Sequence, residues 1–325
     1  MGRLVDGKWV TDAEAAAKDG SFRRADTQFR NWITPDGAPG PSGEGGFPAA
    51  PGRYHLYVAM ACPWAHRTLI FRALKKLEPI VSLSVVEPYM DDHGWAFSDA
   101  LPDHVGGHKR LYEVYAAAVP NYTGRASVPV LWDKQRQTIV SNESSEIIRM
   151  FNSAFDRVGG DASLDFYPKA LRAGIDEINA VVYATVNDGV YRTGFARTQA
   201  AYDTAVTALF DTLDMLDERL ATHRYLMGER LTEADWRLFT TLVRFDAVYF
   251  THFKCNLRRI ADYANLSGYL RELYQMPHIA GTFDLEATRE HYYRSHTSIN
   301  PFGIVPIGPV LDFHSPHRRD RLRAA

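Results

Sequence analysis

A cysteine stands between a strand pattern and a helix pattern in the first half of the chain. Residues 54–58 are typical of a strand, and an apolar stripe with helical spacing follows over residues 63–77. The β-branched run at 80–86 predicts a second strand, parallel to the first, because a helical crossover joins the two. This β–α–β unit predicts an α/β fold for the first half of the chain, with Cys62 at the start of the crossover helix.

The position of Cys62 favours a reactive thiolate. A side chain at a helix start faces unpaired N–H groups and the positive end of the helix dipole, and both stabilise the anion. Pro63 suits the first helical position, and Ala65 stands where a dithiol motif would have its second cysteine. Redox chemistry at Cys62 therefore needs a thiol from another molecule. The alternative role, a small buried hydrophobe, is the one we expect for Cys255.

The length, net charge and cysteine and histidine content of the chain argue against several classes of protein. A length of 325 residues is sufficient for two domains, and a net charge of −2 argues against charge-driven binding to nucleic acid or membranes. The chain shows no secretory pattern and no apolar run that would span a bilayer, so we expect a soluble, cytoplasmic protein. Two cysteines suggest no disulfide framework, and the 12 scattered histidines match no zinc pattern, so no metal is expected.

The patterns divide the chain into five segments. A polar, turn-rich arm over 1–50 precedes a mixed α/β domain over 51–157, which has a long insertion at 87–122. In that domain the segments 128–132 and 138–140 predict two more strands, although a proline inside the first needs an edge or a special turn. A linker over 158–166 leads to an all-helical domain over 167–300, followed by a tail over 301–325 that we interpret as solvated. The candidate helices of the helical domain are 168–186, 198–222, 232–250, 266–275 and 285–293.

Residues 141–148 carry the signature of a helix N-terminus, with Ser, Asn and Glu before an apolar run. Free N–H groups at such a position suit a carboxylate ligand. The same side chains also suit a simple cap on their own helix, and the pattern alone leaves both interpretations open. In contrast, Thr232 and Asp235 form a capping pattern to which we assign no chemistry.

Taken together, these features resemble a glutathione transferase, which implies a thioredoxin-like domain with a mixed four-stranded sheet followed by a helical C-terminal domain. Several motifs are similar to a narrower family, the glutathionyl-hydroquinone reductases, also called Xi-class glutathione transferases. The resemblance covers nearly the whole chain. The motifs that carry it are Cys62-Pro-Trp-Ala-His-Arg67, Gly94-Trp-Ala-Phe97, Val128-Pro-Val-Leu-Trp-Asp133, Ser141-Asn-Glu-Ser-Ser-Glu-Ile-Ile148 and Pro301-Phe-Gly-Ile304.

The resemblance implies a role for each of ten residues. Cys62 would be the nucleophile, and Pro129 would be a cis-proline whose neighbour Val128 offers its backbone to glutathione. Glu143 and Ser144 would hold the γ-glutamyl end of glutathione, through its ammonium and its α-carboxylate. The remaining residues would cover the tripeptide (Trp95 and Arg125) or line a pocket for the aromatic substrate (Tyr191, Tyr292 and Tyr293).

The activity that this family implies is removal of glutathione from a glutathionylated hydroquinone through a mixed disulfide on Cys62, with glutathione as co-substrate and a homodimer as the assembly. Three alternatives stay open. They are a thioltransferase or dehydroascorbate reductase of the omega type, a conjugating transferase, and a non-catalytic module with the same fold. The sequence identifies neither the physiological hydroquinone nor the proton donor to its ring.

Overall fold

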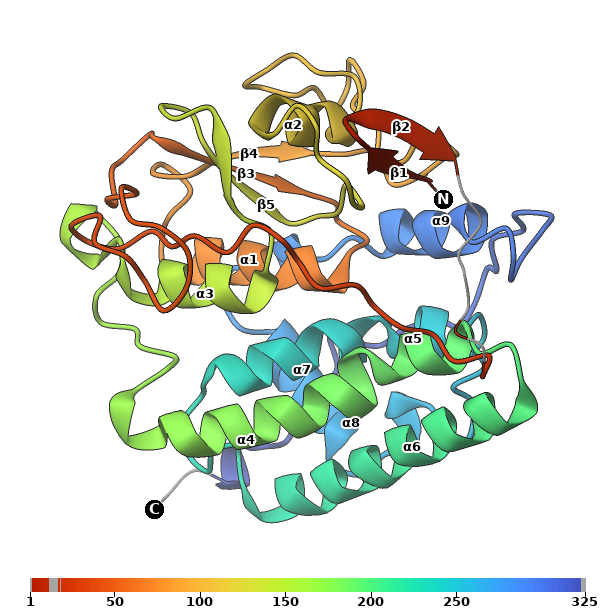
Figure 1. Ribbon diagram of the computed structural model, residues 1–325. Coiled ribbons are helices and arrows are strands. Elements are labelled where there is room, and N and C mark those ends of the chain that lie inside the picture. Colours follow the sequence, from red (N-terminus) through yellow and green to blue (C-terminus); the bar gives the residue numbers. More distant parts are fainter. Residues whose placement is uncertain (1, 12–16, 18, 323–325) are drawn as a thin grey trace. The chain divides into compact units, whose positions relative to one another are not determined.

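The computed structural model describes residues 2–11, 17 and 19–322, which form two compact units (Figure 1). The first unit comprises the described residues of Met1–Glu14, Ala25–Asp165 and Thr282–Ser295. The second comprises those of Ala15–Arg24, Phe166–Gly281 and His296–Ala325. None of the described helices is long and apolar enough to cross a membrane.

The first unit is built on a four-stranded mixed sheet with the order β4–β3–β5–β6. Strand β3 (Tyr54–Val58) pairs parallel with β4 (Ser82–Val85) and antiparallel with β5 (Val130–Asp133). Strand β6 (Thr138–Ser141) closes the sheet antiparallel to β5. All five residues of β3 are buried, as expected for a central strand covered on both faces. The predicted parallel pair and mixed sheet are confirmed.

Helices cover both faces of this sheet. Figure 1 shows α1 (Pro63–Leu74) and α3 (Ser144–Ser153) on one face and α2 (Leu111–Ala118) on the other. A short 3₁₀ turn, η1 (Asp156–Val158), follows α3. Helix α1 ends three residues before the predicted boundary, at Leu74, because Lys76 turns into the left-handed region with φ of 56°.

Two features of the first unit differ from the sequence-based division. The segment expected to be an extended arm begins with a hairpin, β1 (Gly2–Val5) and β2 (Lys8–Thr11), turned at Asp6-Gly7, where both φ angles are positive. Asp-Gly is a hairpin signal that the sequence contained. Leu4, wholly buried, exchanges two backbone hydrogen bonds with Gly124, at 2.9 and 3.0 Å.

The second difference concerns the last helix, α9 (Leu285–Ser295), which the sequence assigns to the helical half. In the structure it belongs to the first unit. Its His291 Nδ1 lies 3.0 Å from the carbonyl oxygen of Pro88, and Ser295 Oγ accepts a hydrogen bond of 2.9 Å from the N–H of Met90. These long-range bonds, which no local pattern encodes, attach α9 to the insertion that follows β4.

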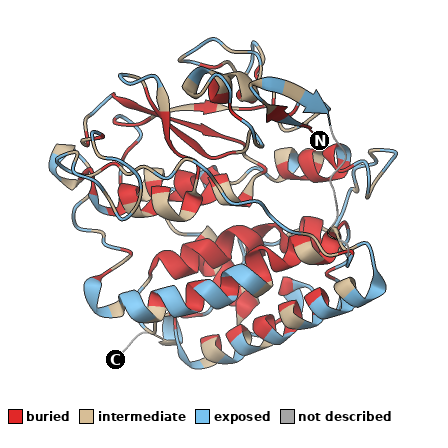
Figure 2. Ribbon diagram, viewed as in Figure 1, coloured by how far each residue is buried: buried red, intermediate tan, exposed pale blue. Residues whose placement is uncertain are grey.

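The second unit is helical, as predicted. Its core is α7 (Glu233–Arg244), every residue of which is buried (Figure 2). The capping pattern is confirmed, since Asp235 accepts from the N–H of Thr232 at 2.8 Å. The other helices are η2 (Lys169–Leu171), α4 (Arg172–Val182), α5 (Gly189–Gly194), α6 (Gln199–Thr222), η5 (Ile260–Asp262), α8 (Leu266–Tyr274) and η7 (Asp320–Leu322), with π-helical turns η3 (Tyr183–Asn187) and η4 (Phe245–Tyr249). The 3₁₀ turn η6 (Ala280–Thr282) spans the boundary, since Thr282 is the first residue of the segment that belongs to the first unit.

Candidate active site

Cys62 is the N-cap residue of α1, with Pro63 at the first helical position. Its Sγ accepts a hydrogen bond from the N–H of Ala65 at 3.5 Å, and the side chain is partly exposed. The sulfur thus lies at the N-terminus of the helix, where the helix dipole is positive. A negative charge on the sulfur is stabilised there. The sequence-based expectation for the position of the thiol, at the start of this helix, is confirmed.

The segment before β5 lies against the thiol. The Val128–Pro129 peptide bond is cis, and the carbonyl oxygen of Val128 is 3.6 Å from Cys62 Sγ. Strand β5 begins only at Val130, so Val128 and Pro129 both lie outside the sheet ladder. The missing N–H of Pro129 therefore removes no hydrogen bond from the sheet. The proline that was awkward inside a predicted strand therefore stands just before the strand, beside the cysteine.

The start of α3 presents a carboxylate that is already ionised. Glu143 is the N-cap residue, and its Oε1 accepts from the N–H and the hydroxyl of Ser145 at 3.0 and 2.8 Å. Its Oε2 accepts from the hydroxyl of Thr27 at 3.2 Å. Burial by itself would raise the pKa of Glu143, but the two bonds from Ser145, with the charge of Arg67, hold the pKa below its usual value. The site can therefore offer a negative charge at neutral pH.

Ser144 is the first residue of α3 and is buried. Its hydroxyl accepts a hydrogen bond of 3.4 Å from Nη1 of Arg67, which lies on α1 five residues after Cys62. Arg67 is only 1% exposed and its guanidinium lies 4.7 Å from the ring centre of Trp64. The sequence leaves Arg67 as structural or as mild support for the thiolate; what identifies it in the structure is its contact with a residue 77 positions away.

Trp95 and Arg125 occupy different environments. Trp95 is buried, with its ring stacked on His291 of α9 at 4.6 Å between ring centres. Arg125 is exposed, and its carbonyl oxygen accepts a hydrogen bond of 3.4 Å from the Tyr122 hydroxyl. Arg125 therefore has the side chain that is accessible to a solute, whereas Trp95 is held by its own packing.

The three predicted tyrosines fall in both units. Tyr292 and Tyr293 are buried on α9 in the first unit, where His291 meets the Tyr292 ring edge-on at 5.3 Å. Tyr191 belongs to the second unit, where it packs among aromatic rings that include Phe195 and Phe253. The guanidinium of Arg24 lies 4.7 Å from the centre of the Tyr191 ring.

The other cysteine has a contrasting environment. Cys255 is fully buried in the second unit, and burial raises the pKa of its thiol far above the ordinary value. A buried thiol of this kind is inert. Among the described residues, no group of three or more His, Cys, Asp or Glu side chains is arranged to hold a metal ion.

Two family models match the chain. The one described as "Glutathione S-transferase, N-terminal domain" covers residues 61–154, which include Cys62, Val128 and Glu143. The one described as "Glutathione S-transferase, C-terminal domain" covers residues 199–272, in the helical unit. The two matches agree with the mixed sheet followed by helices.

Similar proteins are known at nearly full length. A glutathionyl-hydroquinone reductase of Escherichia coli, YqjG, is 57% identical over 98% of this chain and 99% of its own. PcpF of Sphingobium chlorophenolicum, also named a glutathionyl-hydroquinone reductase, is 53% identical over 95% of this chain and 97% of its own. The solved glutathione-bound structure of YqjG superposes with a TM-score of 0.91 at 55% identity, covering 98% of this chain and 99% of that one.

Proposed function

Because this chain belongs to the glutathionyl-hydroquinone reductases, the Xi class of glutathione transferases, we propose that it reduces glutathionyl-hydroquinones to hydroquinones with glutathione as reductant. The observation that carries the proposal is the position of the Cys62 sulfur and its contacts. Its sulfur is partly exposed and accepts a hydrogen bond from the N–H of Ala65, which stabilises the anion. A thiolate so placed is an accessible nucleophile.

The reaction proceeds in two exchanges at sulfur. The Cys62 thiolate attacks the sulfur of the aryl thioether, forming a Cys62–glutathione disulfide and breaking the bond between sulfur and the ring carbon. That carbon takes up a proton, so the ring is reduced while the two sulfurs are oxidised. A second glutathione thiolate then attacks the mixed disulfide, releases oxidised glutathione and restores the Cys62 thiolate.

Cys62 has no resolving thiol of its own in this scheme. Cys255 is wholly buried and burial raises the pKa of its thiol, so an external thiol must complete the cycle. Glutathione meets that need.

We assign the grip on glutathione to the residues around the thiol. The backbone of Val128, before the cis-proline Pro129, would pair with the cysteinyl part. The ionised Glu143 would accept from the glutathione ammonium, and Ser144 with the N–H groups of the first turn of α3 would bind its α-carboxylate. Trp95 and the exposed Arg125 would cover the tripeptide.

For the aromatic half of the substrate we assign Tyr191, Tyr292 and Tyr293. A tyrosine offers a flat apolar face and a hydroxyl, which suits a hydroquinone. We further propose that the protein acts in the cytoplasm, since its only accessible thiol among the described residues needs a reducing compartment. We also propose, on the family resemblance alone, that it assembles as a homodimer.

The experiment is mass spectrometry of the intact protein after reaction with a glutathionylated hydroquinone in the absence of free glutathione, so that the second exchange cannot occur. We expect one glutathione on Cys62, and Cys62→Ser should lose both the adduct and turnover. Cys255→Ser is the matched control and should keep both. Full turnover by Cys62→Ser would end the proposal. Faster turnover on a simple glutathione mixed disulfide than on the aryl thioether would instead favour a thioltransferase of the omega type.

A further inference from the structure

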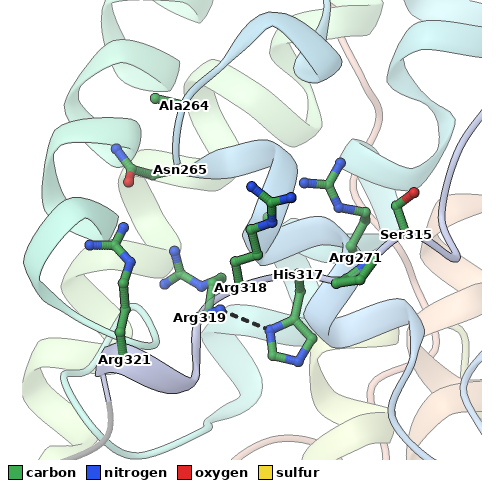
Figure 3. Close-up of a pocket in the computed structure, with 10 residues that line it drawn as sticks. Ala264, Asn265, Arg271, Ser315, His317, Arg318, Arg319 and Arg321 are labelled. Carbon is green, nitrogen blue, oxygen red and sulfur yellow. Dashed lines mark hydrogen bonds between the residues drawn. The ribbon is translucent and has the colours of Figure 1, made fainter.

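A pocket of about 440 Å³ lies in the second unit, between α8 and the C-terminal tail (Figure 3). Helix α8 and the turn before it line one side, and the tail lines the other. The lining is polar and basic, and its residues are Ala264, Asn265, Gly268, Arg271, Ser315, Pro316, His317, Arg318, Arg319 and Arg321. No carboxylate side chain is among them, so this is a concentration of positive charge in a protein whose net charge is −2.

Three of the four arginines have no partner for their guanidinium groups in the part of the chain that the structure describes. Within the residues that the structure describes, the side chains of Arg271, Arg318 and Arg321 make no hydrogen bond and no ion pair. Nε of Arg271 is also buried from solvent without an acceptor. A buried donor left unpaired is destabilising, and cations gathered without a counter-ion repel one another. The arrangement is one that a bound anion would relieve.

The fourth arginine explains why the tail is held in place. Arg319, only 2% exposed, donates to Glu272 Oε2 at 3.1 Å and to the carbonyl oxygens of Leu220, His223 and Arg224 at 2.7 to 3.2 Å. Its donors are therefore committed to the protein. The sequence-based interpretation of the tail as solvated is wrong at this residue, because Arg319 locks the segment onto the helical unit.

Two residues near Arg319, Gly268 and Arg318, shape the pocket. A Cβ at Gly268 would come within 2.9 Å of the carbonyl oxygen of His317, so only glycine lets the tail run this close to α8. Arg318 has a φ of 59°, in the left-handed region that a non-glycine residue rarely adopts. The tail thus takes an uncommon conformation, held by Arg319, with Arg318 lining the pocket.

We propose that this pocket binds the phosphate group of a small phosphorylated molecule. A guanidinium matches phosphate with paired, parallel N–H donors, and three uncommitted guanidinium groups match a doubly charged oxyanion better than a single carboxylate. His317 adds a further donor. Its Nδ1 accepts the N–H of Arg319 at 3.1 Å (Figure 3), so the neutral ring carries its proton on Nε2.

The nearby acids do not cancel this charge. Asp320 pairs with Arg224 at 3.6 Å, outside the pocket. Asp312 receives hydrogen bonds from Ser315 and His314, and the charge of Arg271 is only the last of the causes that lower its pKa. A volume of about 440 Å³ accommodates more than a bare phosphate ion, which favours a phosphate monoester with a small polar body.

The test is titration of the full-length protein with inorganic phosphate and with glycerol 3-phosphate, at constant ionic strength in chloride. The readouts are calorimetry and the NMR signal of the Arg271 Nε–H. We expect saturable binding of both probes, tighter for the monoester, and a shift of that signal because the buried donor gains an acceptor. The thermal midpoint should rise by about 3 °C for each tenfold excess over the dissociation constant.

Arg271→Gln and Arg318→Gln should each weaken binding about tenfold, while Arg258→Gln should not change it. Arg258 is the matched control because it is an arginine of the same unit whose partner is Asp214, away from the pocket. Arg271→Gln removes a buried donor and a repelling charge, so its thermal midpoint without phosphate should equal or exceed that of the unchanged protein. That result separates lost binding from lost folding.

The absence of saturable binding at 10 mM of either probe, or equal weakening by Arg258→Gln and Arg271→Gln, would overturn the proposal. Binding of inorganic phosphate alone, with glycerol 3-phosphate excluded, would overturn the assignment to a phosphorylated molecule. Neither result bears on the chemistry at Cys62, which these experiments do not use.

Discussion

Arg67 Nη1 donates a hydrogen bond of 3.4 Å to Ser144 Oγ, and this bond joins the helix that begins after Cys62 to the helix start to which we assign the γ-glutamyl end of glutathione. Arg67 also lowers the pKa of Glu143, the residue before Ser144. A buried cation on α1 thus contacts one residue of the assigned γ-glutamyl site, Ser144, and adds to the hydrogen bonds from Ser145 that keep the other, Glu143, ionised.

Arg67→Gln should raise KM for glutathione about tenfold and lower kcat much less, because the lost contacts act on binding. The pKa of Glu143 should rise when the cation is removed. Binding needs the carboxylate ionised, so the loss of affinity at acid pH should begin at a higher pH than in the unchanged protein. Steady-state kinetics from pH 4 to 8 measure both effects. Arg67→Lys keeps the charge and should leave the pH profile in place; an Arg67→Gln profile that matches the unchanged protein would contradict this account.

Trp9 holds the turn that leads to Trp95. Its Nε1–H donates to the carbonyl oxygen of Asp92 at 2.9 Å, and its ring stacks on Tyr112 at 4.8 Å. Trp9→Leu should therefore increase hydrogen exchange of the amides at 92–95 at least tenfold and raise KM for glutathione. Val10→Ala, at an exposed position of the same strand, is the control and should change neither. Unchanged exchange at 92–95 in Trp9→Leu would show that the hairpin does not support the turn.

His55 should make stability depend on pH between about 4 and 6.5. It is wholly buried on β3 between the hydroxyls of Ser82 and Ser84, at 2.7 and 2.9 Å, and burial lowers its pKa to about 4. The unfolded chain binds this proton from about pH 6.5, so the stabilising contribution is complete above that pH and is lost as pH falls toward 4. The loss amounts to about 3 kcal/mol at most.

Urea unfolding at a series of pH values measures the slope. His55→Gln, which does not titrate, should flatten the stability curve of the first unit in that interval, whatever its cost at pH 7. If the curves of stability against pH for the two proteins were parallel, a group other than His55 would be responsible for the pH dependence.

Gly194 ends α5 against an aromatic ring. A Cβ there would lie 2.2 Å from Cγ of Phe253, whose ring packs edge-on against Tyr191 at 5.4 Å. Gly194→Ala should therefore destabilise the second unit by about 3 kcal/mol, although alanine is the better helix former. Gly281→Ala is the matched control, because a Cβ there meets nothing within 4 Å. Thermal unfolding compares the two variants. Equal midpoints would mean that the rings of Phe253 and Tyr191 move aside with no loss of stability.

Local patterns were sufficient for several of the elements and for the position of Cys62. The strand at 54–58, the helix beginning at Pro63 and the Thr232–Asp235 cap depend on residues within one or two turns of each other, and the structure has them where the sequence predicts them. The same holds for Cys62 at its N-cap, since a helix start is a local feature with local electrostatics. Family motifs added the cis peptide bond at Pro129.

Only the tertiary structure decided which distant residues meet. Arg67 reaches Ser144 across 77 positions, Trp9 reaches Asp92 across 83, and Arg319 reaches Glu272 and fixes a tail that its own composition marks as solvated. The placement of α9 in the first unit has the same cause, because Ser295 and His291 bond to residues more than 200 positions earlier. Periodicity and capping are set by neighbours along the chain, whereas buried charges take whichever partners the packing of the whole unit brings within reach.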